Sequence, residues 1–461
     1  MTRTSALRLK SDERGLALVM VIGMMALLSV VSITLINVVT AEGTRSRTAV
    51  ADDAATQAAE AGIQDYIAKL LDDNLYYMHY VHPGEATRKG SDGVSKSAGQ
   101  AWTGVTTWTY PNGKDTWRSL GNGYEYDLEI TPPSASNPNV GIVSTGRPTG
   151  STDHSQWRAV QELIRPSSVS DFQMISDADI SYGSTATTRG PVYAGIDSSG
   201  HKHNIAHAGV AYGNLYAEGS VTGSVTMMNG AQKYSSSTIR SVIPTAINFS
   251  DFLTSLSQVQ TAAQAGGVYL NNTSVDAWWL TFQSNGTFTA ATCTKTSGND
   301  VAGTMPTCGT PTTYNVPVNG AVYVGQSAII SGQVNGRVTV VSNNNIIIGN
   351  NISYVTSGDD VLGLVANNNV EVAQYVPSTL NWNAATIAEN GQFYSYSNDG
   401  SHSTMTFTGS TATKNGGSMG LFQTRNYNYD NTLLYLQPPW FPRVGDPYSI
   451  LLERQVSATS S

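Results

Sequence analysis

The sequence has few charged side chains and no cluster of positive charge. Only 13 % of its 461 residues are Asp, Glu, Lys or Arg, about half of the usual share in soluble proteins. The 25 basic residues are outnumbered by 33 acidic ones and form no block, which argues against nucleic acid as a partner. The chain also lacks a phosphate-binding P-loop, a dinucleotide-binding glycine motif and a Gly-x-Ser-x-Gly nucleophile motif. These absences give no support to an ATPase, a dehydrogenase or a serine hydrolase.

Small polar residues take the place of the missing charges. The chain contains 44 glycines, and Ser, Thr and Asn are abundant. With 40 % hydrophobic residues it can bury a large core, so the composition excludes an intrinsically disordered chain. We expect strands and tight turns whose polarity comes from hydroxyl and amide groups, as in a secreted or surface-exposed β-protein.

Near the amino terminus, residues 16–41 contain no charged side chain. This run is long enough to cross a bilayer as one helix. The residues before it carry more positive than negative charge, with Arg3, Arg8, Lys10 and Arg14 against Asp12 and Glu13. This excess predicts a single-pass protein of the cytoplasmic membrane with its amino terminus inside and its body outside the cytoplasm. A cleaved signal peptide is the alternative, although the run is longer than the apolar region of such peptides.

Helical character continues beyond the uncharged run. Residues 42–71 contain no proline and are rich in Ala, and their small and apolar side chains follow helical spacing. We therefore expect one helix over 16–75, half in lipid and half projecting. Its stripe of small residues would let other helices or a globular head pack closely. A break near Gly43 would give two helices instead.

Two short motifs resemble the PilX-type minor pilins of bacterial type IV pili. Glu13-Arg14-Gly15 is followed by Leu16-Ala17-Leu18-Val19, and Ala58-Ala59-Glu60-Ala61-Gly62 comes later in the helix. The resemblance implies that a prepilin peptidase removes residues 1–15 after Gly15, which makes Leu16 the new amino terminus, open to methylation. It also implies that the helix packs among other pilins through Met20 and the 58–62 motif. An inner-membrane pilus assembly platform and membrane lipid are the further partners that it implies.

Two positions depart from the pilin pattern. Most pilins have Phe at the first mature position and Glu at the fifth, whereas this chain has Leu16 and Met20. In major pilins that glutamate pairs with the terminal amine of a neighbouring subunit inside the apolar filament core, where an unpaired amine would be costly. We therefore expect a subunit of the filament tip, of an initiating complex or of low abundance.

Residues 76–168 predict a small β-rich head. Three stretches, at 123–132, 140–148 and 157–166, alternate polar and apolar side chains, as strands with one buried face do. Ser144-Thr145-Gly146-Arg147 also resembles part of the small sheet of PilX-like proteins. Strands packed on the end of a long helix are what this resemblance implies.

In residues 169–246, and again in 319–461, short β-runs alternate with Gly and Asn. This pattern predicts two blocks of a β-solenoid, a coil of short parallel strands whose corners use the backbone freedom of Gly and Asn. Stacked Asn side chains should form hydrogen-bonded ladders. An antiparallel β-sandwich is the alternative.

The carboxy-terminal part resembles domains of unknown function attached to some PilX-like proteins. The resemblance is carried by the stretch 359–372 and by the Pro- and aromatic-rich stretch 427–442. It implies an architecture and no activity. We expect the ending, with Trp440, Phe441 and Tyr448, to cap the open end of the solenoid.

Between the two blocks, residues 247–318 predict an insertion. A helix at 247–267, capped by Ser250, is followed by a hairpin at 277–293. Cys293 and Cys308 both lie here, and outside the cytoplasm such a pair is expected to form a disulfide. Two reduced cysteines are the alternative.

Three histidines lie close together in the first block, at His201, His203 and His207. Two of them would lie on one side of a strand, and the third could join across a turn. We expect no metal and no cofactor, with these three as the candidate ligands if a metal binds.

Two pairs of carboxylates are candidates for catalysis, because solenoid enzymes that act on acidic polysaccharides use such groups. The pairs are Asp177 with Asp179, and Asp359 with Asp360. On a strand, Asp177 and Asp179 would point to the same face. However, Ser-Asp-Ala-Asp at a strand boundary and Gly-Asp-Asp in a turn are ordinary loop sequences, and we expect no enzymatic activity.

The sequence thus predicts an α+β, mainly β protein with a pilin-like helix, a small head and a solenoid body. Its expected function is that of a pilin-like structural component in pilus assembly or surface adhesion, with a surface ligand or a glycan as a further partner. One alternative is a membrane-tethered enzyme that binds or cleaves polysaccharide. The other is a self-polymerising scaffold of the cell envelope.

Overall fold

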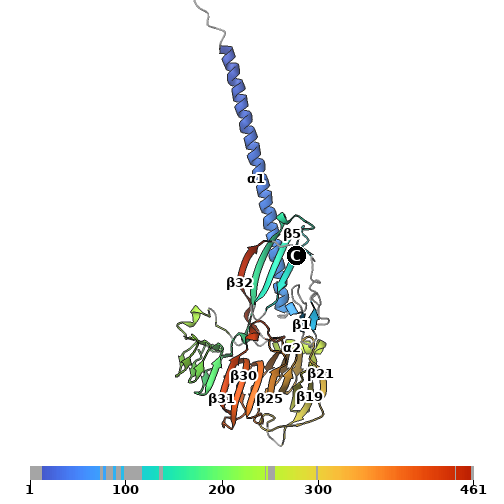
Figure 1. Ribbon diagram of the computed structural model, residues 1–461, viewed down its shortest axis with the longest axis vertical. Coiled ribbons are helices and arrows are strands. Elements are labelled where there is room, and N and C mark those ends of the chain that lie inside the picture. The colour runs from blue at the N-terminus through green and yellow to red at the C-terminus, as the bar shows by residue number, and fades with distance from the viewer. Residues whose placement is uncertain are drawn as a thin grey trace, which may run out of the picture.

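The computed structural model contains a long helix, an antiparallel sheet packed on it and a large set of short strands beyond that sheet (Figure 1). It describes residues 13–72, 76–78, 87–89, 95–97, 117–133, 139–243, 246–247, 255–296, 300–441 and 443–457. Most of the predicted leader therefore lies outside the described residues.

Helix α1 (Glu13–Asp72) is a single helix of 60 residues. It contains the whole of 16–41 and continues through Gly43, so the alternative of two helices is wrong. The lack of proline allows this continuity, because an internal proline would remove a helical hydrogen bond. Among the described residues, no helix is both long enough and apolar enough to span a membrane.

The sheet on α1, here called the head, has five strands in the order β3-β4-β5-β6-β32. The three strands predicted in this region are present as β4, β5 and β6. The last strand of the head comes from the far end of the chain and pairs antiparallel with β6. The predicted head, 76–168, is therefore incomplete without it. The strands are β3 (Arg118–Ser119), β4 (Tyr124–Thr131), β5 (Val140–Pro148), β6 (Arg158–Ser168) and β32 (Arg443–Val456). A separate hairpin joins β1 (Thr87–Lys89) to β2 (Ser95–Ser97).

Beyond the head, short strands of the second block pair in parallel with the strand one turn later. Val322 pairs with Val340, and Val340 with Leu364. One series is β22 (Ala321–Val324), β24 (Arg337–Ser342), β26 (Val361–Ala366), β28 (Thr379–Ala388) and β30 (His402–Thr413). Another is β23 (Ser327–Val334), β25 (Ile346–Tyr354), β27 (Val370–Val372) and β29 (Phe393–Ser395), and β31 (Phe422–Tyr429) pairs with β30. Their buried apolar faces form the core.

The strands of the first block extend the parallel ladders of the second block. β30 pairs in parallel with β7, and β31 with β9, so the end of the second block stacks on the start of the first. Residues 174–234 and 268–429 together are called the coil below. Further strands are β7 (Met174–Ser176), β8 (Ile180–Tyr182), β9 (Ala186–Arg189), β10 (Val192–Ala194), β11 (Ile205–His207), β12 (Val210–Ala211), β13 (Leu215–Ala217), β14 (Val221–Thr222), β15 (Thr226–Met227) and β16 (Lys233–Tyr234).

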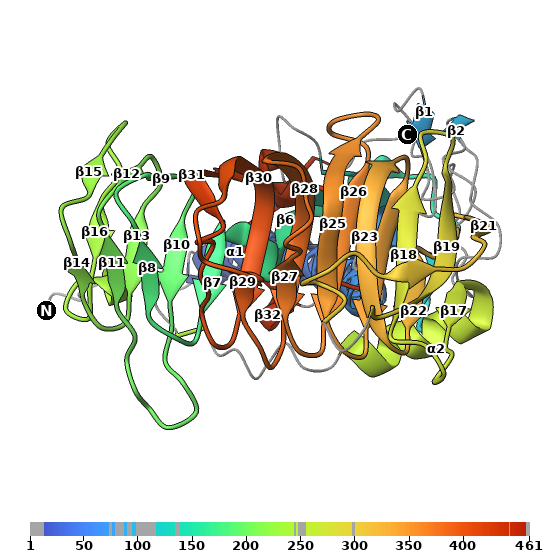
Figure 2. The same ribbon diagram turned by 90° about the horizontal axis from the view of Figure 1, so that it is seen from below.

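The chain therefore enters the coil near its middle, winds to one end, crosses to the other end and winds back (Figure 2). At the far end β17 and β18 pair in parallel with β22 and β23, so part of the predicted insertion belongs to the coil. From β18 the predicted hairpin leads into antiparallel strands that finish this end. The elements are α2 (Ser255–Gly266), β17 (Val268–Leu270), β18 (Ala277–Phe282), β19 (Thr287–Thr294), β20 (Thr307–Cys308) and β21 (Thr312–Asn315). The predicted helix cap, Ser250, lies outside the described residues.

Asparagine side chains form ladders along the corners of the coil, as predicted. Asn367 Nδ2 donates to the carbonyl oxygen of Asn343 at 3.2 Å, and Asn390 Nδ2 donates to Asn367 Oδ1 at 3.1 Å. Asn415 Nδ2 continues the row with a 2.9 Å bond to the carbonyl of Asn390. These bonds satisfy backbone groups at corners where the strand ladders stop.

The Pro- and aromatic-rich ending does not cap an end of the coil, contrary to the prediction. Phe441 is buried against Gly363 of β26, on the side of the coil. Trp440 Nε1 donates to the carbonyl oxygen of Asn319 at 2.6 Å. Tyr448 pairs with Pro166 in the head. The ending therefore runs along the coil and then becomes the last strand of the head.

Candidate functional site

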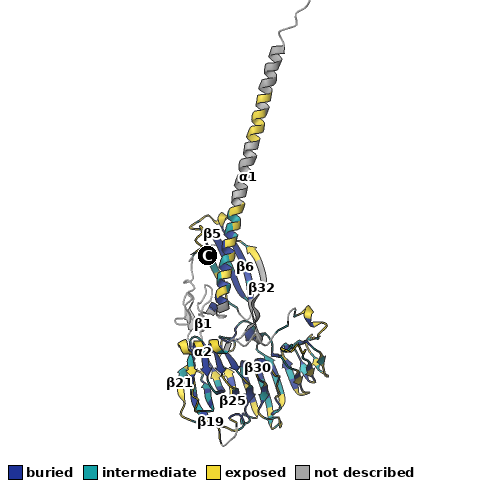
Figure 3. Ribbon diagram, turned by 180° about the vertical axis from the view of Figure 1, so that it is seen from behind, coloured by how far each residue is buried: buried dark blue, intermediate teal, exposed yellow. Residues whose placement is uncertain are grey.

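The residues predicted for leader cleavage and filament packing, Gly15, Leu16 and Met20, lie in α1, and their side chains are outside the described residues. Further along α1 the described side chains between Met24 and Thr34 are all exposed (Figure 3). Most of them are large and apolar, namely Met24, Met25, Leu28, Val30, Val31 and Ile33. The two hydroxyl groups of Ser29 and Thr34 donate to helix carbonyl groups, at 2.7 Å and 2.8 Å. This part of α1 thus offers a mainly apolar surface on which the hydroxyl groups of Ser29 and Thr34 are already bonded.

The carboxyl half of α1 packs on the head through the predicted small-residue motif. Ala58 and Ala59 are buried, and a Cβ atom on Gly62 would overlap Ser144 and Tyr126. Of the other two motif residues, Glu60 is exposed and Ala61 is partly buried. The small residues therefore bring the helix close to this chain's own sheet.

Charged side chains hold the helix in register on the head. Asp65 Oδ2 accepts bonds from Lys69 Nζ at 2.5 Å, Arg118 Nη1 at 2.8 Å and the Tyr126 hydroxyl at 2.9 Å. Burial acts to raise the pKa of Asp65, but the bond from Lys69 and the neighbouring charges outweigh it and hold that pKa below its usual value. A second ion pair joins Asp52 of α1 to Arg158 of β6.

The head and the coil share one hydrophobic cluster. On α1 it includes Tyr66 and Leu70, and on the coil Val365 and Ile387. The hydroxyl of Tyr77 also donates to the carbonyl oxygen of Tyr435, at 3.3 Å. A helix fixed to the head is thereby fixed to the coil as well, which can hold the coil at one end of α1.

The predicted disulfide is present. Cys293 of β19 and Cys308 of β20 are opposite each other in an antiparallel ladder and are covalently bonded. Among the described residues no cysteine is free. The bond closes the hairpin region at the end of the coil.

The two carboxylate pairs considered for catalysis lie in turns. Asp177 and Asp179 follow β7 in a turn, not in a strand as the same-face prediction required. Asp360 is fully buried and accepts from the N–H groups of Gly336 at 2.7 Å and Thr356 at 2.6 Å. Asp360 thus organises a corner of the coil, which is a structural task.

The three histidines separate into two environments. His207 faces the interior, where its ring contacts Tyr182 and its Nδ1 accepts from the N–H of Gly209 at 3.0 Å. Burial, with Lys233 nearby, lowers its pKa to about 4. The prediction that His207 could join the other two is therefore wrong.

His201 and His203 instead meet Asp179. The donor atoms of these three side chains lie within 4.8 Å of one another. The N–H of Asn204 bonds to Asp179 and lowers the pKa of that carboxyl. The two histidines could be predicted as candidate ligands from the sequence, but their proximity to Asp179 could not. The stacking of successive turns of the coil brings Asp179 next to them.

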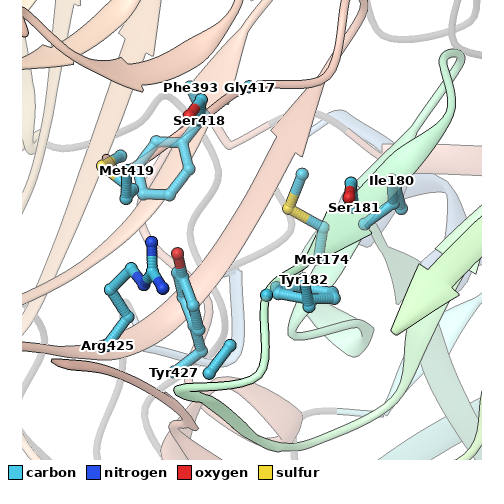
Figure 4. Close-up of a pocket in the computed structure, with 12 residues that line it drawn as sticks. Met174, Ile180, Ser181, Tyr182, Phe393, Gly417, Ser418, Met419, Arg425 and Tyr427 are labelled. Carbon is cyan, nitrogen blue, oxygen red and sulfur yellow. The ribbon is translucent and has the colours of Figure 1, made fainter. Parts of the chain in front are cut away.

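A cavity of about 250 Å³ lies where the two blocks of the coil meet (Figure 4). Apolar side chains from both blocks line it, including Met174, Tyr182, Phe393, Met419 and Tyr427. The guanidinium of Arg425 is at its wall and donates to Thr185 Oγ1 at 2.5 Å. Sequence reasoning missed this cavity, because it depends on the contact between blocks.

A distant neighbour appears among solved structures. The competence-associated pilin ComZ from Thermus thermophilus aligns over 88 % of this chain and 97 % of its own length, with a TM-score of 0.26 and 13 % sequence identity. No protein-family model and no curated protein matches the chain.

Proposed function

We propose that the chain is a pilin-like structural subunit of a bacterial type IV pilus or a related secretion filament. One observation carries the proposal. A single 60-residue helix is uncharged over 16–41 and exposes apolar side chains between Met24 and Ile33, while its carboxyl half packs on an antiparallel sheet. The apolar half would lie in the cytoplasmic membrane before assembly and among other pilin helices afterwards. Bonded hydroxyl groups, as at Ser29 and Thr34, suit both environments because neither contains water.

The coil is the part that such a subunit would display. We interpret its parallel ladders as a β-solenoid that grows out of the head, with both connections at the pair Ser168 and Arg443. Rigid attachment through the shared hydrophobic cluster supports a display role. A surface ligand or a glycan is the partner that a displayed coil would contact, outside the cytoplasmic membrane.

The missing glutamate supports a special position in the filament. Met20 cannot pair with the terminal amine of a neighbour, so insertion in the middle of a filament would leave a charge unpaired in an apolar core. The proposal therefore places the chain at a tip or in an initiating complex. Other pilins, a prepilin peptidase and an inner-membrane assembly platform would be its partners.

The mature amino terminus tests this proposal. We expect mass spectrometry of the full chain, expressed with a prepilin peptidase, to show loss of residues 1–15. The matched control is Gly15→Glu, which should keep its leader because a large charged side chain replaces the residue before the cut. Retention of Met1 in the parent chain, or a cut after Ala41, would contradict the processing that the proposal requires.

A further inference from the structure

A cluster of two imidazoles and two carboxylates lies at the base of the loop between β10 and β11. His203 Nδ1 is 3.3 Å from Asp179 Oδ1, and His203 Nε2 is 3.4 Å from Asp197 Oδ2. The ring of His201 lies 4.8 Å from the ring of His203, centroid to centroid. The loop supplies three of these residues, and Asp179 comes from the turn between β7 and β8.

Backbone hydrogen bonds set the shape of this loop. Asp197 Oδ1 accepts from the N–H groups of Ser199 at 2.9 Å and His201 at 3.0 Å. The N–H of His203 donates to the carbonyl oxygen of Gly195 at 3.0 Å. Across the gap, Asp179 Oδ1 accepts from the N–H of Asn204 at 2.8 Å. The side chains are thus brought together by bonds that need no metal.

Two carboxylates flank the imidazole of His203. Its Nδ1 faces Asp179 and its Nε2 faces Asp197. The side chain of His203 is only 12 % exposed, so water can reach little of it. With Nε2 beside Asp197, Nδ1 is the ring nitrogen that can bind a metal ion together with Asp179.

We propose that Asp179, His201 and His203 bind a divalent transition-metal ion, with Zn²⁺ as the representative ion. Two imidazoles and one carboxylate are a typical donor set for zinc and its neighbours, whereas Ca²⁺ and Mg²⁺ take oxygen ligands. Asp197 fits the outer role of a carboxylate that orients a metal-bound imidazole. Such an ion fastens the loop between β10 and β11 to the coil through Asp179.

The test uses the full chain in detergent, purified without a polyhistidine tag, and titrated with Zn²⁺ by calorimetry. We expect equimolar binding by the parent chain. His203→Ala and Asp179→Asn should each weaken binding by about 10-fold or more. His154→Ala removes an exposed histidine of the head and should bind as the parent does. Equal binding by His203→Ala and the parent chain, or no binding by the parent chain, would overturn the proposal.

Hydrogen exchange separates this site from scattered surface binding. In the parent chain Zn²⁺ should slow exchange of the backbone amides in 195–204, and in His203→Ala it should not. A thermal melt of each variant without metal checks that the fold is kept. If Zn²⁺ binds but leaves exchange in this loop unchanged, the ion lies elsewhere and the assignment is wrong.

Discussion

Ser168 of β6 and Arg443 of β32 are paired residues of neighbouring antiparallel strands, although the whole coil lies between them in the sequence. The head is therefore closed by a strand that follows the coil in the sequence. Arg454 strengthens this closure, because its Nε and Nη2 both donate to Gln161 Oε1, at 2.9 Å and 2.7 Å.

Removal of the last strand should loosen the head and leave the coil intact. A chain ending at residue 442 loses the partner of β6, whose backbone groups then face water. We expect hydrogen exchange at β6 to become about 10-fold faster or more, since the ladder bonds there are lost, while exchange at β24 and β26 stays unchanged. The matched control ends at residue 457 and keeps β32. Equal exchange at β6 in both truncated chains would contradict the closure.

The close contact between α1 and β5 leaves no room for a side chain at Gly146. A Cβ atom there would overlap the carbonyl oxygen of Ala55 and the backbone nitrogen of Ala59. We expect Gly146→Ala to lower the free energy of unfolding by about 1–3 kcal/mol, the usual cost of overpacking. The control is Gly266→Ala, whose added atom would lie 3.9 Å from the nearest side chain, Asn319. Denaturant melts that give the same stability for both variants would show that the helix can move away.

The disulfide should stabilise the end of the coil. Replacement of Cys293 and Cys308 together by Ser should reduce the free energy of unfolding by about 2–4 kcal/mol, mainly because the unfolded chain gains freedom. The rate of hydrogen exchange should rise more at the backbone amides of β19 and β21 than at those of β28. Treatment of the parent chain with a reductant serves as the control and should reproduce the effect. Unchanged stability after reduction would contradict a stabilising role.

Glu371 should make stability depend on pH. It is almost fully buried, and its carboxylate oxygens accept from the Tyr394 hydroxyl at 2.6 Å and from Asn345 Nδ2 at 3.1 Å. Burial raises its pKa to about 7, from 4.5. Because the folded state holds this proton more tightly than the unfolded state, stability falls as pH rises from 4.5 to 7 and the loss is complete above that range.

Glu371→Gln should remove this loss. Relative to the parent chain the variant should gain up to about 3 kcal/mol between pH 5 and pH 8, since each unit of pKa shift corresponds to about 1.4 kcal/mol. Denaturant melts of the variant and the parent chain at the lower and the higher pH measure this gain in the free energy of unfolding. Glu60→Gln changes an exposed carboxylate of α1 and is the control. A constant difference between Glu371→Gln and the parent chain at the two pH values would show that Glu371 ionises normally.

The local sequence pattern was enough to predict many of the strands. β22 and β24 lie in the part of the chain where short β-runs are predicted, and each is a short, mainly β-branched or apolar run bounded by Gly or Asn. The hairpin at 277–293 was also predictable, since Asn285 and Gly286 suit a tight turn. Such signals need only a few neighbouring residues.

Pairings between distant segments were not predictable in this way. The parallel contact of Ala412 with Ile175 joins two blocks that are far apart in the sequence, and no turn signal records it. The histidine cluster illustrates the same limit, because stacking of turns supplies Asp179. A local signal for His207 was available, however: it alternates with Ile205 in a strand, and both face inward.

Both connections between the coil and the head leave at the same end of the sheet, at Ser168 and Arg443. A tensile force applied to the coil therefore enters the head through two backbones pulled in the same direction. Resistance comes from the ladder between β5 and β6, whose hydrogen bonds lie perpendicular to the strands and are loaded together. Tension on the coil would therefore load these hydrogen bonds in shear, so that several of them must break together before β6 separates from β5.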